Sequence, residues 1–204
     1  MDRNQKGFTL IEILVVVTII GVLAGLVVVL IPKGQFEAKK TECMSNVKNI
    51  VGMLTIERDY PTKYGGVNLI LQLIKRGKLE GEDSLKILFC PGDKSNTWDD
   101  AGGMEAYGST MDVKKKGEYD HLSSYAGRDQ TNKACRASSG AAKQVILVCD
   151  DSEDHHDAKG YVVGLTGGAA KWRHKFDDWE VDMKTPVLIG EGSQIKELEC
   201  MRGD

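Results

Sequence analysis

The sequence predicts an α+β protein in which a long N-terminal helix packs on a small antiparallel β-sheet. Three observations support this fold class. An apolar run extends from Phe8 to Ile31, and an apolar stripe at helical spacing follows from Phe36 to Leu54. Short apolar segments separated by glycine-rich turns then fill the C-terminal half, as expected of strands. A helix followed by strands that cover one of its faces is typical of the α+β class.

The apolar run is long enough to cross a membrane. It has 24 residues, of which Glu12 is the one charged residue. As a helix it spans about 36 Å, more than the ~30 Å hydrocarbon core of a bilayer. Arg3 and Lys6 precede the run, so we expect a cytoplasmic N-terminus and an exported C-terminal part. A secretory signal peptide has a shorter apolar region that ends in small residues, and a plain anchor explains the length but not Glu12.

Glu12 is the unusual residue of this run. A charged side chain within a membrane helix costs about 2.5–3.5 kcal/mol on insertion scales, so it predicts a function and a partner. Cleavage between Gly7 and Phe8 would create an α-amino group at Phe8 that is mostly cationic at neutral pH. When such helices stack, this amine can pair with Glu12 of a neighbour. A cut at that position would therefore give Glu12 a counter-ion and a role in assembly.

The segment Lys6-Gly7-Phe8-Thr9-Leu10-Ile11-Glu12 resembles the processing motif of type IV prepilins and type II secretion pseudopilins. The resemblance implies that a prepilin peptidase cuts after Gly7 and N-methylates Phe8, and that Glu12 supports fibre assembly. It implies a structural fibre subunit and not an enzyme. The implied partners are other pilin or pseudopilin subunits in a homo- or heteropolymer, the prepilin peptidase, an assembly platform and, before assembly, the lipid bilayer. The implied location is the bacterial inner membrane, as a single-pass protein, and then a periplasmic or cell-surface fibre.

We expect three parts: a leader over residues 1–7, a membrane or fibre-core helix over 8–31, and an exported head over 32–204. Pro32 would kink the helix at the junction without ending it. The apolar stripe carries the helix on to about Asp59. Further along the chain, the patterns predict a helix at Leu69–Lys75 capped by Gly77, a loop over residues 92–120, and strands at Leu85–Cys90, Gln144–Cys149, Tyr161–Leu165 and Ala169–Trp172.

Short motifs in the C-terminal part extend the resemblance. They are similar to those of prepilin-type proteins that carry an H-x9-DG motif. In this chain nine residues follow His156 and then come Thr166 and Gly167, so that Thr166 replaces the aspartate of the motif. The other motifs are Cys43-x-x-Asn46, Phe89-Cys90-Pro91, Ser124-Tyr125 and Val145-Ile146-Leu147.

An acidic segment with two histidines occupies residues 150–157. Carboxylate-rich loops favour Ca²⁺, whereas histidine favours Zn²⁺ or another transition metal. The resemblance adds an expectation of Ca²⁺, because major pseudopilins hold that ion in a C-terminal loop. The residues expected to surround a cation are Asp150, Asp151, Asp154 and His156. The alternative is a solvated acidic turn without any cofactor.

Five cysteines all follow the apolar run, and their odd number leaves at least one unpaired. Cys43 begins on the helical stripe, and Cys90 ends a strand that we expect to cross it. A Cys43–Cys90 disulfide is therefore expected, in a compartment that permits such bonds.

Other functional classes have little support in the sequence. The net charge of −3 does not predict a nucleic-acid partner, which would need a basic face. His121, Ser123 and Ser124 could be imagined in an anchored hydrolase, but no nucleophile-elbow, zinc-protease or phosphate-loop motif accompanies them. The main alternative to a fibre subunit is a membrane-anchored extracytoplasmic protein that binds a ligand or a metal.

Overall fold

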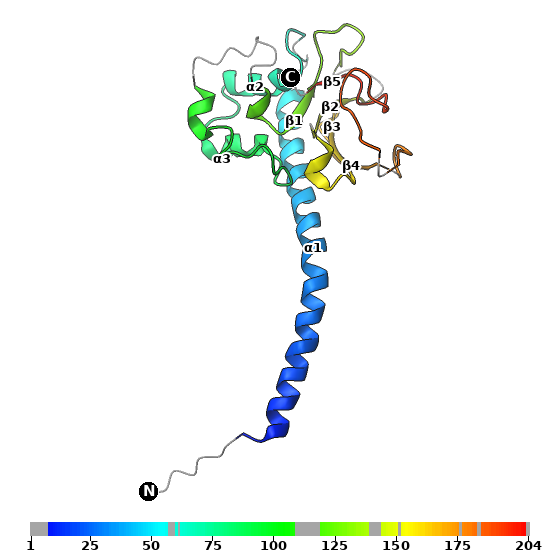
Figure 1. Cartoon of the computed structure of the whole chain (residues 1–204). Coiled ribbons are helices and arrows are strands. Elements are labelled where there is room, and N and C mark those ends of the chain that lie inside the picture. Colours follow the sequence, from blue (N-terminus) through cyan, green and yellow to red (C-terminus); the bar gives the residue numbers. More distant parts are fainter. Residues whose placement is uncertain are drawn as a thin grey trace. The chain divides into compact units, whose positions relative to one another are not determined.

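The structure is a computed structural model of the whole chain. It describes residues 8–56, 60, 62–108, 119–138, 144–150, 152–175, 177–182 and 185–202. The chain forms two compact units, Met1–Ala38 and Lys39–Asp204. Helix α1 (Leu10–Thr55) contributes residues to both units (Figure 1).

The long N-terminal helix predicted from the sequence is confirmed. It begins at Leu10 and ends at Thr55, and Pro32 lies inside it. Residues 57–59, where the sequence pattern placed its end, lie outside the described part of the chain. A proline in a helix removes one backbone hydrogen bond, but the helix continues on both sides of Pro32.

The helical stripe packs into the core of the second unit. Five of its residues recur at spacings of three, four and one, which places them on one face of α1. Full burial of an aliphatic side chain contributes roughly 1.5–3 kcal/mol, so this face is a major source of stability. The five buried residues are Cys43, Val47, Ile50, Val51 and Leu54.

A five-stranded antiparallel sheet completes the second unit. Its strand order is β4-β3-β2-β1-β5, so β1 to β4 are neighbours in chain order and β5 pairs with β1 at the other edge. The predicted hairpin is confirmed by the antiparallel pairing of β3 with β4. The predicted strand that ends at Cys149 is also confirmed, with bounds shifted toward Asp150. The strands are β1 (Tyr125–Arg128), β2 (Ile146–Asp150), β3 (Gly160–Leu165), β4 (Ala170–His174) and β5 (Met201–Arg202).

The predicted strand at Leu85–Cys90 is wrong. The segment instead continues α3 (Glu82–Leu85) into a 3₁₀ turn, η1 (Lys86–Leu88). Leu85 and Leu88 are buried whereas Lys86 between them is exposed. A spacing of three suits a helical turn and not the alternation of a strand. The other 3₁₀ helices in the described residues are η2 (Gly103–Tyr107), η3 (Asp120–Leu122) and η4 (Glu153–His156).

Helix α2 (Val67–Lys75) confirms the predicted short helix and its glycine cap. Gly77 has a φ of 63°, in the left-handed region. The Lys78 N–H donates to the Leu73 carbonyl at 2.9 Å, and the Gly77 N–H donates to the Ile74 carbonyl at 2.9 Å. This pair of bonds is a Schellman motif, which satisfies the carbonyls left open at the end of the helix.

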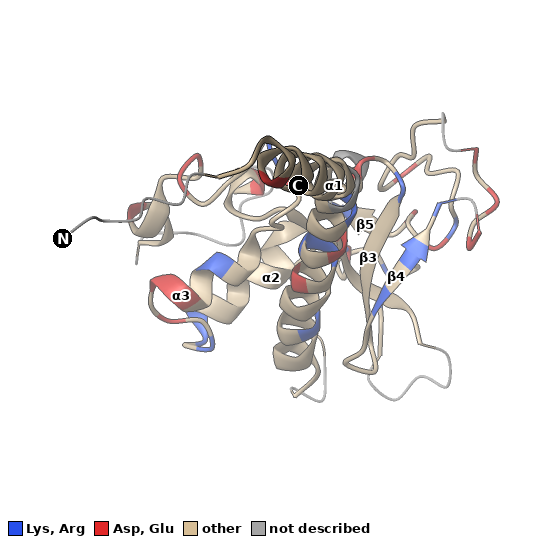
Figure 2. Cartoon of the chain, turned by 90° about the horizontal axis from the view of Figure 1, so that it is seen from below, with Lys and Arg blue, Asp and Glu red and all other residues tan. Residues whose placement is uncertain are grey.

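The sheet lies between two apolar layers. Val162 faces the layer that contains α1 and α2, whereas Tyr161 and Val163 face a layer built from the C-terminal segment. This alternation follows from the two-residue period of a strand. Charged positions of both signs are interspersed over the helices and strands (Figure 2), which agrees with the small net charge.

Helix α1 lies very close to the sheet at Gly164 of β3. A Cβ atom at this position would lie 2.3 Å from Val51 Cγ2 and 2.8 Å from Val47 Cγ1. Both distances are well below van der Waals contact, and both partners are branched side chains fixed in the core. Glycine at this position therefore sets how closely α1 lies on β3.

We predict that Gly164→Ala destabilises the second unit by roughly 1–3 kcal/mol, because added volume in a packed core forces its neighbours to move. Urea unfolding of the full chain in detergent, followed by tryptophan fluorescence, measures this because Trp98, Trp172 and Trp179 all lie in that unit. Gly52→Ala is the matched control, because a Cβ atom added at Gly52 of α1 would have no neighbour within 4 Å. It should be neutral or stabilising, by up to about 1 kcal/mol. Equal effects of the two substitutions would contradict the packing argument.

Candidate functional site

The first described residues form a capped helix start. The Glu12 carboxylate accepts hydrogen bonds from the Thr9 backbone N–H at 2.7 Å and from the Thr9 hydroxyl at 2.8 Å. The Glu12 backbone N–H donates to the Thr9 hydroxyl oxygen at 3.3 Å. This reciprocal arrangement is a capping box, which satisfies N–H groups that the first turn leaves open. Within a single chain, the carboxylate of Glu12 is therefore already bonded to Thr9.

The apolar run that follows Glu12 is exposed in the single chain. Helix α1 contains a strongly apolar segment, and no residue of that segment is buried. Phe8 and Leu10 are each 85% exposed. By length and composition, α1 is the one helix among the described residues that could cross a membrane. An apolar surface of this extent requires lipid or other protein around it.

Two of the three N-terminal site residues predicted from the sequence belong to the described part of the chain. Phe8 precedes the helix in non-helical backbone, and Glu12 lies in the first turn. Gly7 falls outside the described residues. Sequence reasoning missed the role of Thr9, although Thr-x-x-Glu ahead of an apolar run is the pattern of a capping box.

A second group of polar side chains lies buried in the other unit. The Cys43 thiol donates to Asp150 Oδ1 at 3.1 Å. Cys90 Sγ lies 3.6 Å from His156 Nε2, which is itself 3.5 Å from Asp150 Oδ2. One sulfur, nitrogen or oxygen atom from each of these four residues lies within 4.8 Å of the other three. We call Cys43, Cys90, Asp150 and His156 the four-residue cluster.

Three elements and one connecting segment bring the cluster together. Cys43 comes from the buried face of α1, and Cys90 follows η1. Asp150 ends β2, and His156 ends η4. All four are buried. More than forty residues separate Cys43 from Cys90 along the chain, so only the tertiary fold makes them neighbours.

A buried pair, Asp93 and His155, borders the cluster. His155 Nε2 lies 3.1 Å from Asp93 Oδ2, and the Ser124 hydroxyl donates to the same oxygen at 2.7 Å. Asp93 Oδ1 accepts from the Ser95 and Asn96 backbone N–H groups at 2.8 and 3.0 Å. Asp93 therefore ties a surface turn to β1 and to η4.

Burial and hydrogen bonding shift the pKa values of the buried acidic side chains and thiols in opposite directions. Burial alone would raise the pKa of Asp93, but the hydrogen bonds from His155 and Ser124 hold it well below its usual range. The Cys43 thiol, followed by His155 and His156, lowers the pKa of Cys90 by hydrogen bonding. Burial raises the pKa of the Cys43 thiol and of the Asp150 carboxyl. The four-residue cluster thus favours one thiolate, at Cys90.

The expected disulfide is corrected by the structure. Cys43 and Cys90 are free thiols, although they lie close together as the sequence argument required. The disulfide joins Cys135 and Cys200, whose Cα atoms are 5.3 Å apart. The Cys43 thiol instead bonds to Asp150, which the sequence argument had not placed beside it.

The group of possible cation ligands found in the structure shares only some residues with the one expected from the sequence. Asp150 and His156 do lie together, but Cys43 and Cys90 complete the group of possible ligands. Asp151 and the side chain of Asp154 lie outside the described residues. The cysteines were missed because they are far from the acidic segment in sequence.

The other polar motifs of the sequence have structural contacts. The Ser123 hydroxyl donates to the Leu88 carbonyl at 3.1 Å, and His121 is exposed beside Asp120. Thr166, which replaces the aspartate of the H-x9-DG motif, lies in the turn between β3 and β4 and accepts a bond from the Val145 N–H at 3.3 Å.

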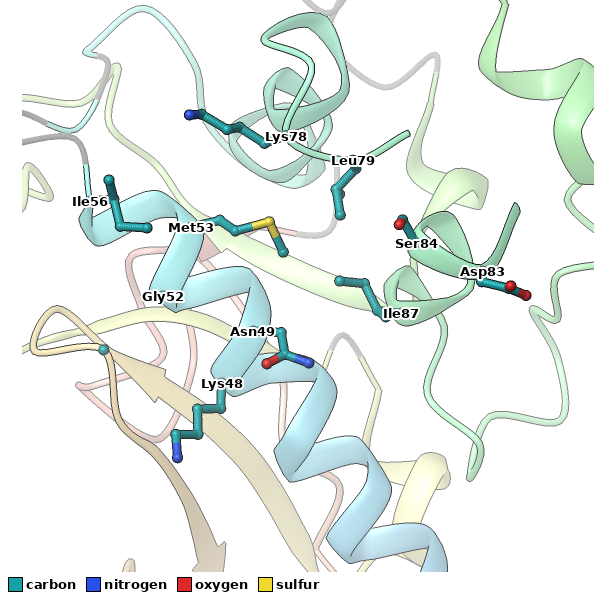
Figure 3. A pocket seen from close by; sticks show the side chains of 11 residues that line it. Lys48, Asn49, Gly52, Met53, Ile56, Lys78, Leu79, Asp83, Ser84 and Ile87 are labelled. Carbon is teal, nitrogen blue, oxygen red and sulfur yellow. The ribbon is translucent and has the colours of Figure 1, made fainter. Parts of the chain in front are cut away.

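A pocket of about 620 Å³ opens between α1 and the α3–η1 segment. Met53, Leu79 and Ile87 point into it, and Lys48 and Asp83 lie at its margin (Figure 3). Most of its surface is apolar, although polar and charged side chains also line it, and it is distinct from the four-residue cluster. Such a lining offers contact area but little directional chemistry.

Comparison with known proteins bears on the N-terminal segment first. Residues 2–28 match the family described as "Prokaryotic N-terminal methylation motif". The chain carries a prepilin-type methylation motif. This match agrees with the resemblance found in the sequence and includes Gly7, Phe8 and Glu12.

Curated relatives extend the similarity over a longer stretch than the methylation motif. The chain is 36% identical over 76 residues to "Type II secretion system core protein G" of Dickeya chrysanthemi, which is 35% of this chain and 50% of that protein. It is 38% identical over 74 residues to the protein of the same name from Pseudomonas aeruginosa, covering 34% of this chain and 52% of the relative. The chain therefore spans about half the length of the curated relatives it matches. No solved structure matches the chain.

The buried Asp93 yields a stability prediction. Asp93→Ala removes the acceptor of two side-chain and two backbone donors, together with the carboxylate that lies 3.1 Å from His155 Nε2. We expect a loss of roughly 3–5 kcal/mol of unfolding free energy. The measurement is urea unfolding of the full chain in detergent. Asp120→Ala, at a carboxylate that is 57% exposed, should stay within about 0.5 kcal/mol of the wild type. A small effect at Asp93 would show that its bonds are not needed.

Proposed function

We propose that this chain is a structural subunit of a type II secretion pseudopilus or of a related type IV pilus-like fibre. It is inserted in the bacterial inner membrane through α1, with its N-terminus in the cytoplasm. A prepilin peptidase cuts it between Gly7 and Phe8 and methylates Phe8. The apolar half of α1 then leaves the bilayer and becomes part of the fibre core.

The observation that carries the proposal is a carboxylate inside a methylation motif at the start of a membrane-length helix. Glu12 is the one charged residue between Phe8 and Ile31. A plain anchor has no use for a charge that makes insertion less favourable. The relatives named type II secretion system core protein G, which are similar to about a third of this chain, favour the secretion fibre over other pilus-like machines.

Pairing between subunits gives Glu12 its role. Processing creates a cationic amine at Phe8, and stacking brings that amine to the Glu12 carboxylate of a neighbour. In the single chain the same carboxylate is bonded to Thr9. During assembly, the Glu12 carboxylate therefore replaces its bonds to Thr9, or shares them, with the Phe8 amine of the neighbouring subunit. Its charge then has a partner both before and after it enters the fibre core. An unpaired charge there would cost roughly 3–5 kcal/mol.

The first prediction concerns processing. Protein isolated from native membranes should begin at Phe8 and carry one methyl group on its amine, as measured by mass spectrometry of the N-terminal peptide. Gly7→Val should block the cut, because a branched side chain crowds the scissile bond, and the chain should then retain Met1. Assembled material that still begins at Met1 would refute the proposal.

The second prediction separates a fibre subunit from an anchored ligand- or metal-binding protein. Glu12→Ala and Glu12→Gln should be processed normally but form less polymer, because each incoming amine lacks a counter-charge. Glu12→Asp should be intermediate, since it keeps the charge on a shorter side chain. The readout is sheared or cross-linked polymer per unit of processed protein.

Thr18→Val is the matched control for the Glu12 series. Thr18 is a polar residue of the same span whose hydroxyl donates to the Val15 carbonyl at 2.8 Å, so its replacement removes polarity but no charge. It should assemble as the wild type does. If Glu12→Ala is cut and polymerises as well as the wild type, the pairing mechanism fails and the anchored binding protein becomes the better interpretation.

A further inference from the structure

We propose that the four-residue cluster is a structural zinc site, in which Cys43 and Cys90, Asp150 and His156 hold one Zn²⁺ in a tetrahedral arrangement. This site is independent of fibre assembly. The sequence argument had placed a Ca²⁺ ion among carboxylates of the same segment. The donor atoms found in the structure are two sulfurs, one imidazole nitrogen and one carboxylate oxygen.

The spacing of the donor atoms fits this geometry. Zn²⁺ binds sulfur at about 2.3 Å and nitrogen or oxygen at about 2.0–2.2 Å, so the edges of its ligand tetrahedron are roughly 3.3–3.8 Å long. Cys43 Sγ and Asp150 Oδ1 are 3.1 Å apart, and Cys90 Sγ and His156 Nε2 are 3.6 Å apart. The four donors all lie within 4.8 Å of one another, so side-chain shifts would bring them to the corners of such a tetrahedron.

The chemistry of the donors selects the ion. Ca²⁺ takes six to eight oxygen ligands, and the cluster offers far fewer. Thiolate and imidazole together favour Zn²⁺ among the abundant divalent ions. Four protein ligands complete the coordination, which is the pattern of a structural site and not of a catalytic one.

Groups around the cluster orient the donors. The second carboxylate oxygen of Asp150 accepts the Val162 backbone N–H at 2.6 Å. The Gly92 N–H donates to Cys90 Sγ at 3.4 Å, and the His156 ring stands edge-on to Trp172 at 5.3 Å. Outer contacts of this kind fix the direction of metal ligands and tune their basicity.

A disulfide between Cys43 and Cys90 explains less of the geometry. It would account for two sulfurs but not for a fully buried carboxylate and imidazole directed at the same point. A buried carboxylate needs a compensating charge. Zn²⁺ supplies that charge and binds both sulfurs as thiolates, so the Cys43 thiol releases its proton when the ion binds.

The position of the site indicates what it would do. It ties the buried face of α1 to β2, to η4 and to the segment after η1. Binding to the folded state alone stabilises it by mass action, so thermal unfolding should shift upward as Zn²⁺ is added.

The test uses the full chain purified in detergent under anaerobic conditions and stripped of metal with a chelator. After Zn²⁺ is added back and the excess removed, we expect one Zn²⁺ per chain by elemental analysis. Co²⁺ in its place should give the thiolate charge-transfer and intense visible bands of a tetrahedral site. Cys90→Ser and His156→Gln should each weaken Zn²⁺ binding by at least about 100-fold, more than the loss of an outer contact does.

Cys149→Ala is the matched control. Cys149 is also a buried cysteine outside the disulfide and neighbours Asp150 on β2, but its side chain belongs to the opposite apolar layer. Its substitution should leave Zn²⁺ affinity unchanged. His156→Cys keeps a ligand at the position, so it should retain the ion and shift the cobalt spectrum. Tryptophan fluorescence confirms that each variant is folded.

Three results would overturn the proposal. The first is a wild-type chain that takes up no Zn²⁺ after anaerobic purification. The second is a Cys43–Cys90 disulfide in protein from native membranes. The third is a folded Cys90→Ser variant that binds Zn²⁺ as tightly as the wild type does.

Discussion

The close contact between α1 and the sheet is the interaction on which the rest of the folded unit depends. It buries the stripe from Cys43 to Leu54, and it is possible only because β3 has no side chain at Gly164. The same contact brings Cys43 to the end of β2, where Asp150 lies. The absence of a side chain at Gly164 thus allows α1 to pack closely on β3. That packing in turn places the Cys43 thiol beside Asp150.

The two halves of α1 follow different physical rules. Near its start the helix is apolar on all sides, and Glu12 is the one charged residue in that part. Past Ala38 the helix is apolar on one face only, and that face is covered by its own chain. A continuous helix can thus serve lipid or fibre contacts at one end and an ordinary protein core at the other, because backbone hydrogen bonding is satisfied internally in both environments.

Much of this architecture could be read from local patterns. The extent of α1, the hairpin of β3 and β4 and the glycine cap of α2 all follow from periodicity and turn residues. The strand predicted at Leu85–Cys90 was wrong because a short apolar run fits either a strand or a helical turn. Strand β5 has only two residues and exists only through its pairing with β1, so no local signal marks it.

The buried groups were less accessible from sequence because they depend on distant neighbours. The Cys135–Cys200 disulfide spans 65 residues, and five cysteines permit many pairings. The nearness of Cys43 and Cys90 was foreseen, but Asp150 and His156 come from elements whose packing no pattern in the chain specifies. A sequence therefore shows which residues could bind a metal more readily than it shows which of them meet in the folded chain.

The capping box at Thr9 and Glu12 has a consequence for proteolysis. All of its donors and acceptors belong to Thr9 or Glu12, so none comes from the leader that the peptidase would remove. In the proposed processing, these three hydrogen bonds belong entirely to the part of the chain that is kept. The proposed cut between Gly7 and Phe8 would therefore leave a capped helix turn directly behind the new N-terminus.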